Sequence, residues 1–257
     1  MSGQRAGQRL PVSRWAALGA LLAVAAVLIA MLAPIGTRLG WWGFADAVRI
    51  AGWAGYLAGV AAVVCVGGLL DARPGRPRAG FVPALVGFVL TVSLLAYMES
   101  WKTAKVEYPP ISDITTDTDN PPSFWSAPNA REYEGFEAAA WQESAYPDIQ
   151  PLVLSLPPDT VYDLVLALVD RRGWQLWEAS RDDLHIEATD ETFWFGFKDD
   201  VVIHLTPLPD GRTRVDMRST SRSGGSASDA GTNARRIRRF LRDLQRAAER
   251  SAEGATR

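Results

Sequence analysis

Three long apolar runs in the first hundred residues constrain this chain more than any other feature. They cover residues 15–33, 50–70 and 80–98, and none of them contains a charged residue. A helix rises about 1.5 Å per residue, so about 20 residues cross a hydrocarbon core of about 30 Å. None of the runs has the polar stripe, at a period of 3.6 residues, of a helix in a soluble core. They therefore predict a three-helix transmembrane region over residues 1–100.

The same runs indicate an anchor and not a transport path. Ion pathways usually place ionisable side chains inside the spans, because such groups are costly in lipid and are kept for function. No Asp, Glu, Lys, Arg or His lies within these three runs. Gly55 and Gly59 form a small-xxx-small pair, which serves either a homodimer or the packing of the helices within one chain. Membrane lipids are the expected surroundings of this region.

Basic residues in the short loops predict the orientation of the spans, because cytoplasmic loops carry an excess of Lys and Arg. Such residues precede the first run and crowd the turn between the second and the third, at Arg5, Arg9, Arg14, Arg73, Arg76 and Arg78. The sequence thus predicts an inner (plasma) membrane protein with a cytoplasmic N-terminus and a periplasmic or otherwise extracytoplasmic C-terminal domain. The first run also has features of a signal peptide, whose removal would leave this topology unchanged.

Residues 101–257 have the composition of a soluble domain, and their first part is unusual. Residues 101–157 are rich in Pro, Asp and aromatic residues, which predicts an arm that packs on the domain, with a short helix around residues 134–143. Asp113, Asp117 and Asp119 invite a calcium interpretation, but the glycine and the distal glutamate of an EF-hand loop are missing. No metal or other cofactor is expected.

Residues 158–250 follow the pattern of an α+β domain. Asp159 is expected to cap a helix whose apolar residues recur at spacings of three and four. Short alternating segments predict an antiparallel meander of strands over residues 174–178, 184–188, 192–197, 201–206 and 214–219. Turns are expected at residues 182–183, 198–200 and 209–211. A helix over residues 229–250 completes an open sheet with helices on one face, and residues 251–257 are expected to form a disordered tail.

Polar side chains gather on one face of the expected sheet, because alternate residues of a strand point to the same side. The set comprises His185, Glu187, His204, Arg214, Asp216 and Arg218. Two histidines with carboxylates can bind a metal, but no two histidines here share the close spacing that makes such a signal strong. A solvated polar face is the simpler interpretation.

A Gly/Ser-rich loop between the last strand and the last helix gives the sharpest binding signal. Backbone amides at a helix N-terminus can hold an anion, and arginines surround this one. The residues expected to shape the site are Arg218, Ser219, Ser221, Arg222, Asp229, Asn233 and Arg235. No Gly-Lys-Ser/Thr follows, so the loop is not a P-loop. Alternatively, the arginines form a solvated helix face or pair with acidic residues such as Asp199 and Asp200.

Several separated motifs occur in order along the outer half. They read Ile-Thr-Thr-Asp-Thr-Asp-Asn-Pro-Pro-Ser-Phe at residues 114–124, Tyr-Pro-Asp-Ile-Gln-Pro at 146–151, Asp-Asp-Val-Val at 199–202, Val-Asp-Met-Arg-Ser-Thr-Ser-Arg at 215–222 and Ser-Asp-Ala-Gly-Thr-Asn-Ala-Arg-Arg-Ile-Arg at 228–238. Over residues 108–245 the chain resembles domain-of-unknown-function family 1499, some of whose bacterial and plastid members carry membrane helices. The resemblance identifies the domain. It implies no particular activity, because none is established for the family.

Two functions from different classes fit these residues. The first is a non-catalytic envelope domain that binds a partner protein, or an anionic lipid or glycan headgroup, at the Arg-rich junction. The alternative is a hydrolase of envelope material in which Asp200, Asp216 or His204 acts as acid or base. Clustering of these side chains in one pocket would favour the enzyme. Nucleic acid is not an expected partner, because the compartment and the acidic first half of the outer domain oppose it.

Overall fold

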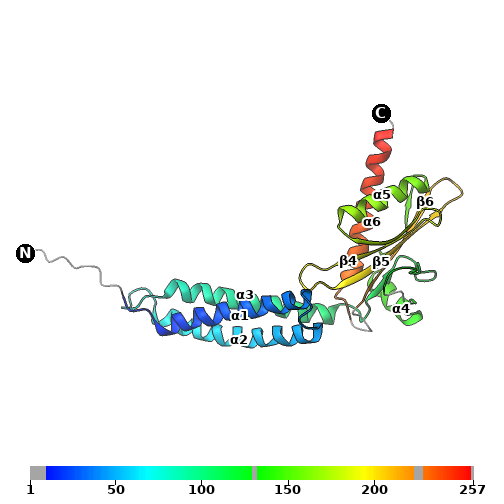
Figure 1. Cartoon of the computed structure of the whole chain (residues 1–257). Helices are drawn as coiled ribbons and strands as arrows, with labels where there is room; N and C mark the ends of the chain where they lie inside the picture. Colours follow the sequence, from blue (N-terminus) through cyan, green and yellow to red (C-terminus); the bar gives the residue numbers. More distant parts are fainter. Residues whose placement is uncertain (1–9, 129–131, 223–227, 256–257) are drawn as a thin grey trace, which may run out of the picture. The chain divides into compact units, whose positions relative to one another are not determined.

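The computed structural model describes residues 10–128, 132–222 and 228–255, and the chain forms two compact units, Met1–Thr103 and Ala104–Arg257. The helices of the first unit are α1 (Arg14–Arg38), α2 (Phe44–Asp71) and most of α3 (Phe81–Glu107) (Figure 1). Three helices of the described chain are long and apolar enough to cross a membrane by length and composition. The predicted three-helix region is thereby confirmed.

Small residues let the helices of the first unit approach closely. A Cβ added at Gly19 of α1 would lie 2.8 Å from Sγ of Cys65 on α2. A Cβ added at Gly55 would lie 2.9 Å from the terminal methyl carbon of Met98, whereas Gly59 has open space around it. Gly55 therefore packs within the chain, and a homodimer through Gly55 and Gly59 stays a prediction.

The second unit is built on a six-stranded antiparallel sheet with helices on one face (Figure 1). Its elements are β1 (Asp113–Thr115), α4 (Phe136–Ala145), β2 (Leu152–Leu154), α5 (Pro158–Arg171), β3 (Gln175–Ser180), β4 (His185–Glu191), β5 (Lys198–Pro207), β6 (Thr213–Ser221) and α6 (Thr232–Ala255). The strand order is β1-β6-β5-β4-β3, and β2 also pairs with β6. The predicted α+β class and antiparallel meander are confirmed.

The main core lies between this sheet and the helices α5 and α6. Alternate residues of the strands point inward, as the period of two requires. The buried contributors include Val161, Val165 and Leu168 of α5, Val201, Ile203 and Leu205 of β5, Val215 and Met217 of β6, and Ile237, Phe240 and Leu244 of α6. Trp174 stacks on Phe240 with ring centroids 5.3 Å apart.

The arm over residues 101–157 is part of the sheet and does not merely pack on it. Its strand β1 aligns Ile114 with Ser219, and its strand β2 aligns Val153 with Arg214. Both pair with β6, which the sequence places last in the meander. Because of this pairing β6 is an interior strand, and residues more than ninety positions apart share hydrogen bonds.

Two local predictions in the meander are wrong. Residues 192–197, expected as a strand, form the loop between β4 and β5. Their aromatic content raises β propensity, but the pairing of Glu191 with Lys198 already closes the hairpin. Asp199 and Asp200, expected in a turn, lie inside β5 and are buried. Arginines from other elements neutralise them there, as described below.

The helix ends also differ from expectation. Helix α5 begins at Pro158 with Pro157 as its N-cap, so Asp159 lies in the first turn, where it accepts a hydrogen bond from Arg181. Helix α6 continues to Ala255, so most of the expected tail is helical, while residues 256–257 lie outside the described residues. The side chain of Asp229 accepts hydrogen bonds from the amides of Gly231 (2.8 Å) and Asn233 (2.6 Å), and so holds the start of α6.

Candidate functional site

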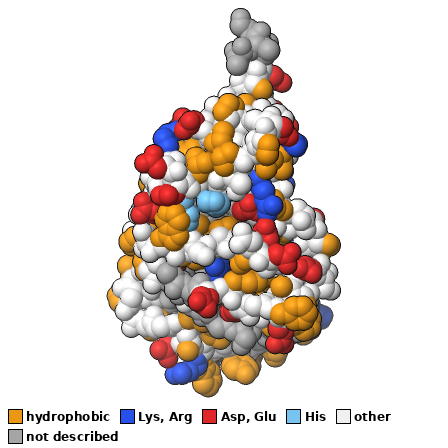
Figure 2. All heavy atoms as spheres, turned by 90° about the vertical axis from the view of Figure 1, so that its right-hand side faces the viewer, with side chains coloured by type: hydrophobic (Ala, Val, Ile, Leu, Met, Phe, Trp, Pro, Cys, Tyr) orange, Lys and Arg blue, Asp and Glu red, His pale blue; other side chains and the backbone are white. Residues whose placement is uncertain are grey.

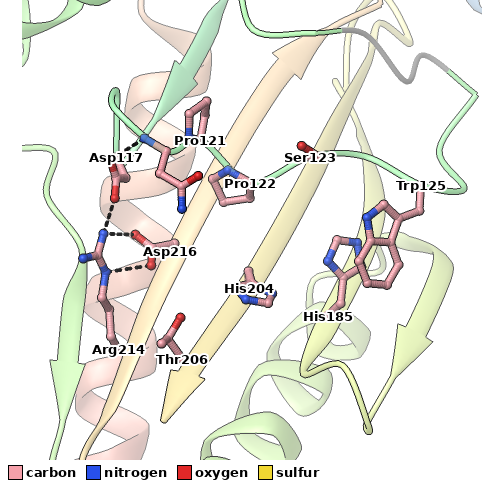
Figure 3. A pocket seen from close by; sticks show the side chains of 11 residues that line it. Asp117, Pro121, Pro122, Ser123, Trp125, His185, His204, Thr206, Arg214 and Asp216 are labelled. Carbon is pink, nitrogen blue, oxygen red and sulfur yellow. Dashed lines mark hydrogen bonds and ion pairs between the residues drawn. The ribbon is translucent and has the colours of Figure 1, made fainter. Parts of the chain in front are cut away.

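The sheet face opposite α5 and α6 carries polar side chains, and the arm covers part of it. Phe124 and Ala127 of the arm pack on Val202 of β5. An open cleft of about 390 Å³ remains between arm and strands, lined by Asp117, Asn120, Pro121, Pro122, Ser123, Trp125, His185, His204, Thr206, Arg214 and Asp216 (Figure 3). The face expected to be solvated is therefore largely covered: Glu187 is 0% and Arg218 1% exposed.

Histidine side chains mark the position of the cleft on the molecular surface. Figure 2 shows imidazole atoms in pale blue near the centre of one face, with carboxylates and a guanidinium beside them. Figure 3 shows His204 between the Trp125–His185 stack and the Arg214–Asp216 pair. The cleft thus has an aromatic end and an ionic end.

The ionic end is a guanidinium held by two carboxylates. Nε of Arg214 donates to Asp216 at 2.8 Å, and Nη2 donates to Asp216 at 2.9 Å and also to Asp117. Burial raises the pKa of Asp117, but hydrogen bonds from the Asn120 amide and from Arg214 outweigh burial and lower it. The hydroxyl of Thr116 donates to Asp216 at 3.2 Å. This end therefore carries two carboxylates against one guanidinium.

The aromatic end depends on the buried carboxylate of Glu187. It accepts hydrogen bonds from the backbone amides of Trp125, Ser126 (3.0 Å) and Ala127 (2.7 Å), and lies 2.8 Å from Nε2 of His185. Burial raises the pKa of Glu187, but these hydrogen bonds outweigh burial and lower it. Trp125 stacks on His185 with ring centroids 3.6 Å apart and stays 53% exposed. Glu187 thus holds the indole of Trp125 in place at the rim of the cleft.

His204 lies between the two ends, opposite His185 on β4 and Asp216 on β6. Burial lowers the pKa of His204, and the neighbouring His185 lowers it further, against the opposing effect of Asp216. The imidazole is therefore neutral at pH 7, so one ring nitrogen donates and the other accepts hydrogen bonds.

Protonation of His204 should destabilise the second unit, Ala104–Arg257. Because its pKa is lower in the folded chain than in the unfolded one, its contribution is complete above about pH 6.5 and is lost as pH falls through the folded value. The free energy of unfolding, measured with urea at pH 7.5 and at pH 5, should fall less in a His204→Asn variant than in the wild type. An equal fall in the two proteins would contradict this assignment.

The residues expected to form an anion site at the Arg-rich junction lie on opposite faces of the sheet. On the cleft face, Arg218 pairs with Asp113 (2.8 Å) and Arg222 with Asp200 (2.7 Å). On the helix face, the amide of Asn233 bonds with Ser219 and Ser221, and Arg236 pairs with Asp199 (2.5 Å). Strand alternation separates the two groups.

The loop–helix junction itself is closed by internal bonds. Asp229 occupies the amides at the start of α6, and Nη1 of Arg235 donates to the carbonyl oxygen of Ala230 at 2.8 Å. Residues 223–227, the centre of the Gly/Ser loop, lie outside the described residues. The structure therefore brings His185, His204, Arg214 and Asp216 of the expected polar face together in the cleft, and a ligand-binding role for the residues of the Arg-rich junction stays a prediction.

Sequence reasoning missed the residues that shape the cleft from the arm. The sequence indicates Trp125 only as one of the aromatic residues of the arm, and Asp117 only as a possible calcium ligand within a family-like motif. The family-like motif at residues 114–124 ends beside Trp125 and could have drawn attention to it. No group of three His, Cys, Asp or Glu side chains in the described part of the chain has the arrangement of a metal site.

A family model described as "Protein of unknown function (DUF1499)" matches residues 113–244, from the first residue of β1 to the buried Leu244 of α6. The chain belongs to this family. The DUF1499 match spans both the arm and the meander, which agrees with the pairing of β1 and β2 with β6. No curated protein matches the sequence.

Proposed function

We propose that this DUF1499 protein is a membrane-anchored, non-catalytic binding protein of the cell envelope, whose outer domain holds a glycan headgroup in the cleft. The apolar helices supply the anchor, and the loop arginines favour an inner-membrane protein with its domain on the periplasmic side. One observation carries the proposal: half-exposed Trp125, neutral His204 and the Arg214–Asp216 pair line a single cleft.

The chemistry of the cleft favours an uncharged ligand rich in hydroxyl groups. The ionic end of the cleft has a net negative charge, because Asp117 and Asp216 face the single guanidinium of Arg214. This charge would repel an anionic ligand. His204 offers both a donor and an acceptor, and the rigidly backed indole of Trp125 offers a flat apolar surface. A sugar ring combines an apolar face with a rim of hydroxyls, which matches both ends.

An anionic headgroup at the Arg-rich junction is supported less well. The guanidinium groups of Arg218 and Arg222 are engaged in ion pairs with Asp113 and Asp200. The amides at the start of α6, which would hold an anion, already bind the carboxylate of Asp229. An added anion would therefore have to displace groups of the protein itself.

The hydrolase alternative also has less support than binding. A general acid or base must reach the substrate proton with a free oxygen or nitrogen. Asp200 is 0% exposed and bonds with Arg222 and Thr189, away from the lining of the cleft. Asp216 lies in the cleft, but Arg214 and Thr116 bond its oxygens. His204 shares the cleft with Asp216, but among the described residues no hydrogen bond joins His204 to a carboxylate that would orient it.

The test is saturation-transfer NMR on the full chain in a detergent without a sugar headgroup. Glucose, galactose and N-acetylglucosamine are the neutral probes, and glycerol 3-phosphate is the anionic one. We expect transfer to at least one neutral sugar. In a Trp125→Ala variant the affinity should fall about two- to tenfold, because lost aromatic stacking is worth about 0.5–1.5 kcal/mol.

Trp141→Ala is the matched control, because Trp141 is similarly exposed (48%) and lies on α4, outside the cleft. The sugar affinity of the Trp141→Ala variant should equal that of the wild type. Transfer to none of the neutral sugars, or equal loss in both variants, would overturn the proposal. Transfer to glycerol 3-phosphate alone would instead support an anionic headgroup as the ligand.

A further inference from the structure

The loop between β4 and β5 exposes aromatic side chains that the cleft does not use. We call residues 192–197, of sequence Thr-Phe-Trp-Phe-Gly-Phe, the aromatic tip. Phe193 is 79% exposed and Trp194 is 55% exposed. The tip contains no charged residue, although Glu191 and Lys198 flank it directly. Exposed adjoining aromatic residues on a soluble domain usually mark an interaction surface.

The aromatic tip is an ordered loop. The amide of Thr192 donates to the carbonyl oxygen of Phe197 at 2.8 Å, and the amide of Phe197 donates to the hydroxyl of Thr192 at 2.9 Å. Phe195 and Phe197 stack with ring centroids 5.1 Å apart, and Phe193 meets Trp194 edge-on at 5.4 Å. The exposed rings are thus presented in a fixed arrangement, which lowers the entropy lost on binding.

We propose that the aromatic tip inserts into the interfacial layer of the membrane that anchors the chain. Indole and phenyl groups beside a polar backbone prefer the headgroup level of a bilayer. Burial there removes apolar surface from water, at roughly 25 cal/mol per Å². The inference rests on the three apolar helices spanning a membrane, and it is independent of the ligand in the cleft.

The covalent connection favours lipid over a separate partner as the occupant. The last candidate span ends at Trp101 and β1 begins at Asp113, so residues 102–112 alone join them. Even a fully extended chain of that length reaches at most about 40 Å. A bilayer surface is therefore always present at high effective concentration, and a small apolar surface suffices to bind it.

The experiment places a nitroxide spin label on the tip of the full chain in liposomes. Cys65 is the single cysteine, so a Cys65→Ala background carrying Phe193→Cys gives one label site. The matched control is Asp210→Cys, in the exposed turn at the other end of β5, about 30 Å away along a strand of 10 residues. Power-saturation EPR then compares access of oxygen, which concentrates in lipid, with that of a water-soluble nickel chelate.

We expect the oxygen-to-nickel accessibility ratio to be severalfold higher at position 193 than at position 210. Trp194→Cys supplies a second label site if Phe193→Cys disturbs the tip, and it should give the same result. Equal ratios at the tip and the control would overturn the proposal, and so would low access of both reagents, which indicates a protein contact. Flotation of the liposomes tests the membrane anchor separately, so failure of the anchor and failure of the tip are distinguishable.

Discussion

Replacing Asp113 with alanine should lower the free energy of unfolding of the second unit, Ala104–Arg257, by about 3–5 kcal/mol. Nε and Nη2 of Arg218 donate to the two carboxylate oxygens of Asp113 at 2.9 and 2.8 Å, and the two side chains are 2% and 0% exposed. The guanidinium also lies over the rings of Phe124 and Tyr133. Without Asp113, the guanidinium of Arg218 loses both hydrogen bonds to this carboxylate at a buried position.

Urea unfolding of the full chain, followed by the circular dichroism of the sheet, measures this loss. Asp148→Ala is the control, because Asp148 pairs with Arg238 at the surface, where the side chains are 58% and 36% exposed. Exposed pairs contribute at most about 1 kcal/mol. Equal destabilisation by the two variants would show that the buried pair has no special role. A double variant, Asp113→Leu with Arg218→Met, should recover much of the loss, since no charge then remains buried.

Replacing Glu187 with glutamine should release the arm from the sheet and destroy the aromatic end of the cleft. The carboxylate accepts from three consecutive backbone amides and from His185, and an amide side chain offers one acceptor oxygen in place of two. Hydrogen bonds to a charged group are worth about 1.5–3 kcal/mol, so the variant should lose at least about 2 kcal/mol. Sugar binding by Trp125 should be lost with it.

Hydrogen exchange of the amides at positions 125–127 reports this release directly. The control is Glu178→Gln, because Glu178 on β3 is half-buried and accepts a hydrogen bond from the hydroxyl of Ser126 at 2.9 Å. It touches the same segment without holding its backbone. Exchange should accelerate in Glu187→Gln and stay unchanged in Glu178→Gln. Equal protection in both variants would mean that the arm is held by other contacts, such as Phe124 on Val202.

Local patterns in the sequence predicted those elements that local composition controls. The apolar runs predicted the helices α1 to α3, because a span needs only length and the absence of charge. The apolar spacing of three and four predicted α5 and α6, and alternation predicted most of β3 to β6. The ordered motifs predicted the family, which a match over residues 113–244 confirms.

Predictions of local structure were wrong where a residue is stabilised by a partner far away in the sequence. The pair Asp199-Asp200 reads as a turn, because two adjacent carboxylates are costly inside a sheet. Arg236 of α6 neutralises Asp199, and Arg222 neutralises Asp200 from the other face. The sequence offers pairing of arginines with these aspartates only as an alternative, and the packing of helix and strands decides which arginine meets which aspartate.

The sequence by itself therefore determined the three apolar helices, the antiparallel sheet and the family, since these follow from short-range periodicity and motif order. Only the tertiary structure decided which polar residues meet. Alternation alone puts His204, Asp216 and Arg218 on one face. The pairing of β1 with β6 brings the arm across that face, which buries Arg218 against Asp113 and leaves His204 and Asp216 beside Trp125 in the cleft. Long-range strand pairing is not encoded in any local pattern, and here it separates the structural ion pairs from the candidate site.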